Sequence, residues 1–252
     1  MEKLVKISAI SYLNTAPFAY GLRHSDIFSK IQLLSDYPSE CARKLQYNEV
    51  DISLLPVGAL PSLSHYEVIT DFCIGAIADV RTVVLLSNSP LHRIRKIYLD
   101  YQSRTSVQLV RILSRYYWNI NPEWVPLSPE QDYSTIPKDY GIVLIGDRVF
   151  EVESRYQFVY DLSGEWGKFT GLPFVFAVWA AASQPTDDFK HQLNHALQLG
   201  VNSIPQSVDE FALKNIERDE AIRYLNQNIS YPLDAEKRKA ISLFLSYMSQ
   251  NQ

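Results

Sequence analysis

The densest group of polar side chains in this sequence is Asp100-Tyr101-Gln102-Ser103-Arg104-Thr105-Ser106, between a strand-like run and a long helical pattern. Three hydroxyls and one guanidinium occupy the last four positions of this segment, where the expected helix begins. A helix cap needs only one hydroxyl, so the excess favours a binding site for an anion such as a carboxylate or a phosphate. We predict substrate contacts from Ser103, Arg104, Thr105 and Ser106.

A second polar segment, Ser11-Tyr12-Leu13-Asn14-Thr15-Ala16-Pro17, directly follows the first strand-like run. Asn14 and Thr15 would place an amide and a hydroxyl beside the N-terminus of the next helix, where unpaired N–H groups favour anions. A helix cap followed by proline in the first turn explains the same residues without a ligand. Tyr12, Asn14 and Thr15 are candidate site residues, with Asn14 a candidate for catalysis.

Arg81 and Thr82 form a third candidate segment, within the strand-like run 80–86. Either side chain could face a ligand cleft, or the two could simply alternate between the faces of a strand. We carry Arg81 forward as a candidate for substrate binding and Thr82 as a candidate for catalysis.

Two glycine-containing turns complete the candidate set. Gly146 and Asp147 follow the strand-like run 141–145, and Thr170 and Gly171 precede the apolar run 174–182. Glycine allows a backbone to approach a ligand closely, although turn formation accounts for both glycines equally well. Gly146, Thr170 and Gly171 are predicted to contact substrate, and Asp147 is a candidate proton acceptor.

Motifs for metal, nucleotide or acyl-transfer chemistry are absent from the sequence. His191 and His195 are four residues apart, but the segment lacks the glutamate of a zinc protease motif. No GxSxG, Walker A or GxGxxG pattern occurs. We therefore expect no metal and no cofactor, and a small molecule as the binding partner.

The composition is that of an ordinary soluble globular protein, with 46% hydrophobic and 21% charged residues and a net charge of −4. No block of Lys and Arg suits nucleic acid, and no apolar stretch reaches the roughly 18–20 residues that span a bilayer. Cys41 and Cys73 are far apart, which favours free thiols in a reducing compartment. The N-terminal residues lack the apolar core of a secretory signal, so we expect a cytoplasmic protein without nucleic-acid or membrane partners.

The hydrophobic patterns predict an α/β protein. Strand-like runs lie at 4–10, 31–34, 51–55, 80–86, 96–99, 123–127, 141–145 and 174–182, and helical patterns at 15–22, 39–47 and 103–118. Strands alternating with helices favour parallel sheets covered by helices. From residue 185 to 248 we predict helices without a strand, packed back on the first half of the chain.

This order predicts two α/β lobes joined by two crossings, one near Ser87 and one near Ala180. The first lobe would comprise residues 1–88 and 179–252, and the second residues 89–178. Such connectivity is typical of hinged binding proteins, in which a ligand lies in the cleft between the lobes.

The segments that suggest a site also resemble, in order, those of the chorismate dehydratases of the futalosine route to menaquinone. The matching stretches are Ile10–Pro17, Asp51–Pro56, Leu99–Asp100 with Ser103–Ser106, Ile145–Asp147 and Thr170–Trp179. The resemblance implies a periplasmic-binding-protein-like (type II) fold used as a cytoplasmic enzyme, and conversion of chorismate to 3-[(1-carboxyvinyl)oxy]benzoate and water without a cofactor. One departure is Thr82, where many relatives carry serine.

Three other functions share this fold. A sister family that forms cyclic dehypoxanthine futalosine carries a different turn after the first strand, of the type Cys-Pro-Asn-Asp. A non-catalytic binding protein for a small carboxylate would bind without turnover. The effector domain of a transcription regulator would need a DNA-binding segment, for which the residues before the first strand leave no room.

A dehydratase must remove the ring C3 proton of chorismate, which places charge in a dienolate conjugated to the ring carboxylate. Hydrogen-bond donors aimed at that carboxylate would stabilise the developing charge. The proton acceptor is either Asp147 or the enolpyruvyl carboxylate of the substrate itself. We favour the substrate, because a dianionic ligand raises the pKa of a neighbouring aspartate.

Overall fold

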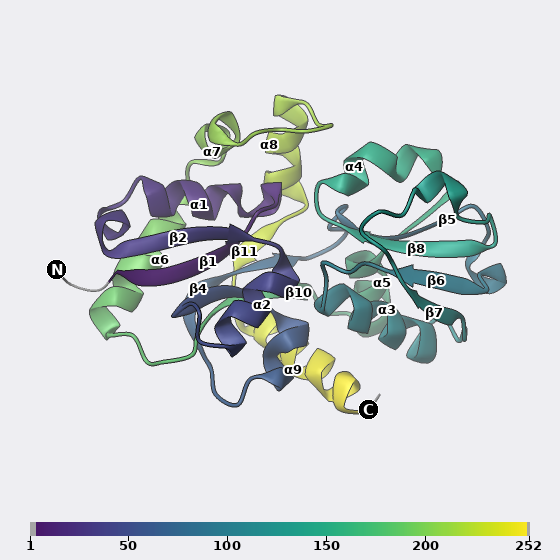
Figure 1. Ribbon diagram of the computed structural model, residues 1–252, viewed down its shortest axis with the longest axis horizontal. Coiled ribbons are helices and arrows are strands. Elements are labelled where there is room, and N and C mark those ends of the chain that lie inside the picture. The colour runs from purple at the N-terminus through teal and green to yellow at the C-terminus, as the bar shows by residue number, and fades with distance from the viewer. Residues whose placement is uncertain (1–3, 251–252) are drawn as a thin grey trace.

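The computed structural model describes residues 4–250, which form two lobes, each built on its own sheet (Figure 1). The first sheet has the strand order β11-β4-β10-β3-β1-β2. Its strands are β1 (Val5–Ile10), β2 (Ile31–Asp36), β3 (Ile52–Pro56), β4 (Glu67–Ala76), β10 (Phe174–Ala181) and β11 (Ser230–Pro232). The strands β2, β1 and β3 are parallel, whereas β10 runs antiparallel to both β3 and β4, so the sheet is mixed.

The second sheet has the order β7-β6-β8-β5-β9. Its strands are β5 (Val83–Ser87), β6 (Lys96–Leu99), β7 (Glu123–Pro126), β8 (Tyr140–Ile145) and β9 (Phe158–Asp161). The strands β7, β6 and β8 are parallel, and β5 is antiparallel to both of its neighbours. The α/β class and the two-lobed architecture predicted from the sequence are therefore confirmed.

The crossings between the lobes differ from the predicted positions. Strand β5 belongs to the second sheet, so the chain crosses before it, between Ala76 and Val83, and not near Ser87. It returns between α5 (Leu162–Thr170) and β10, so the whole of β10 lies in the first sheet. The predicted boundary at 178/179 falls inside β10. A β-branched run reads alike in either sheet, and only its hydrogen-bonding partners assign it to a lobe.

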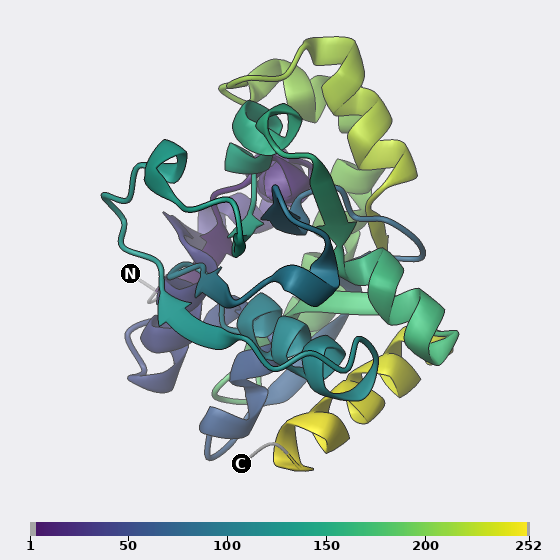
Figure 2. The same cartoon turned by 90° about the vertical axis from the view of Figure 1, so that its right-hand side faces the viewer.

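Helices pack on both sheets. The first lobe contains α1 (Ala16–Arg23), α2 (Pro38–Gln46), α6 (Asp187–Val201), α7 (Ile204–Glu210) and α8 (Arg218–Gln227). The second contains α3 (Thr105–Tyr116), α4 (Arg148–Val152) and α5. The last helix, α9 (Ala235–Gln250), packs on β10 and extends along α3 of the second lobe (Figure 2).

Local sequence explains the best-defined elements. All eight residues of β10 are buried, because this strand is covered on both faces and lies between β3 and β4. Asp161 caps α5 by accepting hydrogen bonds from the Ser163 and Gly164 amides, each at 3.0 Å, and Gly171 ends that helix with φ +72°. The positions at which α5 begins and ends are therefore set by its own sequence.

The chain also contains strands that were not predicted. Strand β4 is continuous, but Thr70 and Asp71 interrupt its apolar sequence pattern, and β9 is only four residues long. Strand β11 lies in the tail that was predicted to be helical, and it pairs with β4 at the edge of the first sheet. Its three residues carry no periodicity of their own, so this part of the prediction was wrong.

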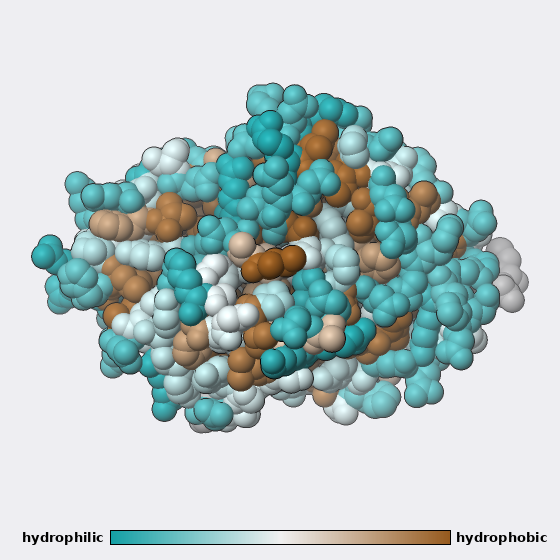
Figure 3. Space-filling model, turned by 180° about the vertical axis from the view of Figure 1, so that it is seen from behind, coloured by the Kyte–Doolittle hydropathy of each residue, from teal (hydrophilic) through white to brown (hydrophobic). Residues whose placement is uncertain are grey.

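The surface seen from behind carries hydrophobic side chains in separate groups among hydrophilic ones (Figure 3). None of the helices between residues 4 and 250 is long and apolar enough to cross a membrane.

Candidate functional site

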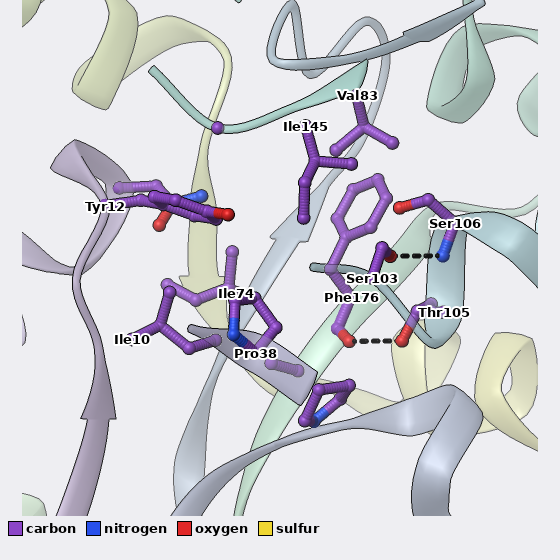
Figure 4. A pocket seen from close by; sticks show the side chains of 14 residues that line it. Ile10, Tyr12, Pro38, Ile74, Val83, Ser103, Thr105, Ser106, Ile145 and Phe176 are labelled. Carbon is purple, nitrogen blue, oxygen red and sulfur yellow. Dashed lines mark hydrogen bonds between the residues drawn. The ribbon is translucent and has the colours of Figure 1, made fainter. Parts of the chain in front are cut away.

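The candidate site is a pocket between the two lobes, with an empty volume of about 420 Å³ including its mouth. It lies at the carboxyl ends of β1, β3 and β8 and at the N-terminus of α3, as expected for an open α/β sheet. The first lobe contributes Ile10, Tyr12, Asn14, Pro38, Pro56, Ile74, Phe176 and Ala177, and the second Val83, Ser103, Thr105, Ser106, Ile145 and Gly146 (Figure 4).

Two serines present hydroxyls to the pocket from the N-terminus of α3. The Ser106 amide donates to the Ser103 Oγ at 2.9 Å, so Ser103 satisfies one unpaired amide of the helix and retains its own proton to donate. The Ser106 side chain lies beside it at the pocket wall (Figure 4). A carboxylate placed here would receive neutral donors and the favourable end of the α3 dipole.

Thr105 connects the lobes. Its hydroxyl donates to the carbonyl of Phe176 at 3.1 Å and accepts from the Gly58 amide at 3.1 Å, and both partners belong to the first lobe. A Cβ at Gly58 would lie 2.8 Å from the backbone of Arg104 and Thr105, so only glycine allows this approach. Arg104 contributes backbone to the contact, and its side chain is not part of the pocket wall.

Asn14 is held from several sides. Thr15, which is buried, donates its hydroxyl to the Asn14 Oδ1 at 3.1 Å, so the two candidates form one unit. The Asn14 side chain is also hydrogen-bonded to the Tyr224 phenol, and the Tyr231 phenol donates to the Asn14 carbonyl at 3.1 Å. These contacts fix the amide of Asn14 at the pocket wall opposite the serines.

Tyr12 reaches across the cleft from the first lobe. Its phenol donates to the side-chain oxygen of Gln102, and burial raises the pKa of Tyr12, so it is a neutral donor. Its ring lies against Gly146, where a Cβ would come within 2.7 Å of the ring atoms. Gly146 also has φ +72°. Both the close ring and this backbone conformation therefore favour glycine at this position.

Asp147 is not one of the residues that line the pocket, although the preceding residue, Gly146, is. Its carboxylate accepts the backbone amide of Leu13, at 3.1 Å to both oxygens, which joins the loop after β8 to the loop after β1. Burial raises the pKa of Asp147 to about 6, and this single hydrogen bond offsets it only in part. A nearby dianion would raise this pKa further.

Thr82 is fully buried, and its hydroxyl is 2.7 Å from the phenolic oxygen of Tyr224 on α8. Since Tyr224 also bonds Asn14, Thr82 reaches the pocket only through this tyrosine. The structure therefore places Asn14 and Thr82 in one hydrogen-bond network, but only Asn14 lines the pocket.

Arg81 lies outside the pocket. It has φ +67°, its guanidinium pairs with Glu220 at 2.6 Å and with Glu153 at 3.2 Å, and it lies over the Phe150 ring. Its ion pairs join α8 of the first lobe to the second lobe near the crossing.

Thr170 and Gly171 also lie apart from the pocket wall. The Thr170 hydroxyl donates to the carbonyl of Trp166 at 2.8 Å, and a Cβ added at Gly171 would meet no atom within 4 Å. Both residues form the end of α5 and the turn into β10.

The pocket wall consists of neutral side chains. Close behind it, Asp100 is buried and its carboxylate accepts the amides of Gln102 and Ile145, each at 2.9 Å, and the Arg148 guanidinium at 2.6 Å. Burial raises the pKa of Asp100, and Arg148 opposes that effect. Asp100 thereby joins the two loops of the second lobe that carry Ser103 and Gly146.

Among residues 4–250, no group of three or more His, Cys, Asp or Glu side chains is arranged to hold a metal ion. The residues that the sequence did not suggest are Gln102, Tyr224 and the apolar wall around Phe176. Gln102 lies inside a candidate segment, but its partner is remote in sequence. Tyr224 has no sequence signal, since it is one apolar-face residue of an ordinary helix.

Comparison with known proteins gives a family and a fold. A family model described as "Menaquinone biosynthesis" matches residues 5–250. The chorismate dehydratase of Thermus thermophilus is 26% identical over 255 residues, covering 92% of this chain and 91% of that protein.

Solved structures share the fold at low identity. A protein of Archaeoglobus fulgidus superposes with a TM-score of 0.79 at 14% identity, covering 98% of this chain and 97% of that one. The periplasmic aliphatic sulphonate binding protein of Escherichia coli superposes with a TM-score of 0.64 at 14% identity, covering 99% and 94%. These likenesses establish a periplasmic-binding-protein-like fold.

Proposed function

This chain belongs to the menaquinone biosynthesis family, and on that premise we propose that it is a chorismate dehydratase. The reaction is that of a hydro-lyase, which converts chorismate to 3-[(1-carboxyvinyl)oxy]benzoate and water. The observation that carries the proposal is the pocket between the lobes, in which neutral donors at the N-terminus of α3 and the amide of Asn14 belong to different lobes. Chorismate has two carboxylates, so two groups of donors on opposite walls suit it.

We assign one carboxylate to the second lobe. The hydroxyls of Ser103 and Ser106 and the N-terminus of α3 supply donors without a positive side chain. The Thr105 hydroxyl already donates one hydrogen bond, to Phe176, and accepts one, from Gly58. We therefore propose that Thr105 holds α3 against the first lobe. The other carboxylate would meet Asn14 of the first lobe, with Thr15 and Thr82 acting through Asn14 and Tyr224. The apolar wall would contact the ring.

The proposed chemistry is an elimination. The C3–H bond breaks, and its electron pair enters the dienolate that extends to the ring carboxylate. The C4–O bond then breaks, the hydroxyl leaves with a proton as water, and the ring becomes aromatic. Donors that bind the ring carboxylate stabilise the intermediate charge, and enclosure between the lobes excludes bulk water. The net reaction is neither an oxidation nor a reduction, so the proposal includes no redox cofactor.

The acceptor of the C3 proton is proposed to be the enolpyruvyl carboxylate of the substrate. Asp147 is the alternative, but it already accepts the Leu13 amide and is not one of the residues that line the pocket. Its pKa of about 6 would rise beside a dianion, which would leave much of it protonated at neutral pH.

The compartment proposed for this enzyme is the cytoplasm. Cys41 and Cys73 are both free and buried, and burial raises the pKa of each thiol to about 12. Unreactive free thiols suit a reducing compartment.

The test is to incubate purified protein with chorismate, without added metal or nucleotide, and to follow the products by mass spectrometry. We expect a product lighter by one water, with the absorbance of a substituted benzoate. Chorismate kept in the same buffer without protein is the control for spontaneous breakdown. Unchanged chorismate in the presence of folded protein would refute the proposal, and dehypoxanthine futalosine would then be tested as the substrate of the sister reaction.

A further inference from the structure

Gln102 forms more contacts across the cleft than any role in capping α3 requires. Its side-chain oxygen accepts the Tyr12 phenol, and its backbone carbonyl accepts the Ser39 amide at 3.1 Å. Both partners belong to the first lobe, whereas Gln102 belongs to the second.

The remaining polar groups of Gln102 hold it within its own lobe. Its amide donates to Asp100 at 2.9 Å, and its side-chain nitrogen donates to the Tyr101 phenol at 3.0 Å. Only 3% of the residue is exposed. A buried amide is costly unless its polar atoms are bonded, and here half of those bonds exist only while the lobes are together.

The Tyr12 side of the contact is tied to the pocket by two further interactions. The Tyr12 ring covers Gly146, and the next residue, Leu13, donates its amide to Asp147. Asn14 follows directly and lines the pocket. Docking of the 12–14 segment on the second lobe therefore sets the distance between Asn14 and the serines of α3.

We propose that Gln102 is a positioning residue, which together with Tyr12 forms an interlobe latch that favours the closed cleft. The consequence for catalysis rests on the proposed dehydratase function, whereas the latch itself does not. With the latch, chorismate meets donors of both lobes at once. Without it, part of the binding energy of the substrate must close the cleft, so KM rises while kcat at saturation changes little.

The latch is tested first without substrate, by hydrogen exchange of the Leu13 and Ser39 amides, which both donate across the cleft. The variants are Tyr12→Phe, which retains the ring over Gly146, Gln102→Leu, and the double variant. Each single variant should accelerate exchange of these amides about fivefold, the change that corresponds to one net hydrogen bond. Because the two side chains bond each other, the double variant should exchange no faster than about the faster single variant.

Tyr160→Phe is the matched control. It removes a tyrosine hydroxyl whose partner, the Leu91 amide at 3.0 Å, lies in the same lobe. Its Leu13 and Ser39 amides should exchange at the wild-type rate. Additive effects of Tyr12→Phe and Gln102→Leu, or unchanged exchange in both, would overturn the latch.

Kinetics with chorismate then test the consequence. Both latch variants should raise KM about fivefold with kcat within about twofold of wild type. If the two residues only stabilised the fold, the variants would instead contain a smaller fraction of folded, active enzyme, so kcat would fall at constant KM. That result would overturn the positioning role. If wild-type protein leaves chorismate unchanged, the proposed function fails, while the exchange experiment still decides whether the latch exists.

Discussion

The backbone amide of Leu13 donates to both carboxylate oxygens of Asp147 at 3.1 Å, across the cleft that separates the two lobes. The contact joins the loops after β1 and β8, which are far apart in sequence. Asp147 therefore has a structural role that needs no proton transfer. Its carboxylate accepts a hydrogen bond from a backbone amide of the other lobe, and this bond favours the closed cleft. The roles of closure and of proton acceptor can be separated by experiment.

Asp147→Asn retains an oxygen that can accept the Leu13 amide but cannot act as a base. We expect kcat to remain within about threefold of the wild-type value, since the substrate carboxylate is the proposed proton acceptor. Steady-state rates of chorismate consumption at pH 7.5 measure this. A loss of about a hundredfold or more, in protein that is folded by circular dichroism, would make Asp147 the base.

The same substitution should change the pH dependence of stability. Burial raises the pKa of Asp147 to about 6 in the folded protein, above the ordinary 3.8 of an unfolded chain. The stabilisation linked to its protonation is therefore complete below pH 3.8 and is lost as the pH rises through 6. Neutral asparagine avoids this loss, so Asp147→Asn should be about 1–2 kcal/mol more stable than wild type at pH 7.5.

Urea denaturation at pH 7.5 and at pH 4 measures this effect. The advantage of the variant should disappear at the lower pH, where Asp147 is largely protonated in the folded protein. Equal stability of the two proteins at pH 7.5 would mean that the ionised carboxylate is not penalised by its surroundings.

Ser106→Ala should lower kcat/KM about tenfold to a hundredfold, because it removes a hydrogen-bond donor to the carboxylate that the second lobe is proposed to bind. Ser114→Ala is the matched control on the same helix, since Ser114 is buried and is not part of the pocket wall. Only the first variant should lose activity, while the midpoints of thermal unfolding stay similar. Equal kinetics for the two variants would place the carboxylate elsewhere.

Gly146→Ala should oppose closure, because the added Cβ would lie 2.7 Å from the Tyr12 ring. Gly171→Ala has the same φ of +72° but meets no atom within 4 Å, so it isolates the backbone strain. Both variants should lose about 1 kcal/mol of stability. Only Gly146→Ala should also raise KM, by about tenfold or more, and similar KM values for the two would mean that the contact with Tyr12 does not govern closure.

Much of the site could be predicted from local sequence. Asn14 and Ser103 lie in the segments that follow β1 and β6, and Ser106 lies in the first turn of α3. The carboxyl ends of strands in an α/β protein are where ligands bind. The side chains of these residues indeed meet at one pocket. Thr170 and Gly171 carry the same kind of signal, but in the structure their turn only ends α5. The prediction failed for these two residues because a glycine that ends a helix and a glycine that contacts a ligand look alike in sequence.

The amino-acid sequence alone determined the α/β class, the two-lobed architecture and the order of the segments that carry polar side chains, since these depend on periodicity and on short-range caps and turns. Only the tertiary structure decided to which lobe β5 and β10 belong, and that Gln102 meets Tyr12 while Tyr224 connects Thr82 to Asn14. Thr82 and Tyr224, for example, are 142 positions apart. No local pattern encodes these relationships, because they exist only once folding has brought distant segments of the chain together.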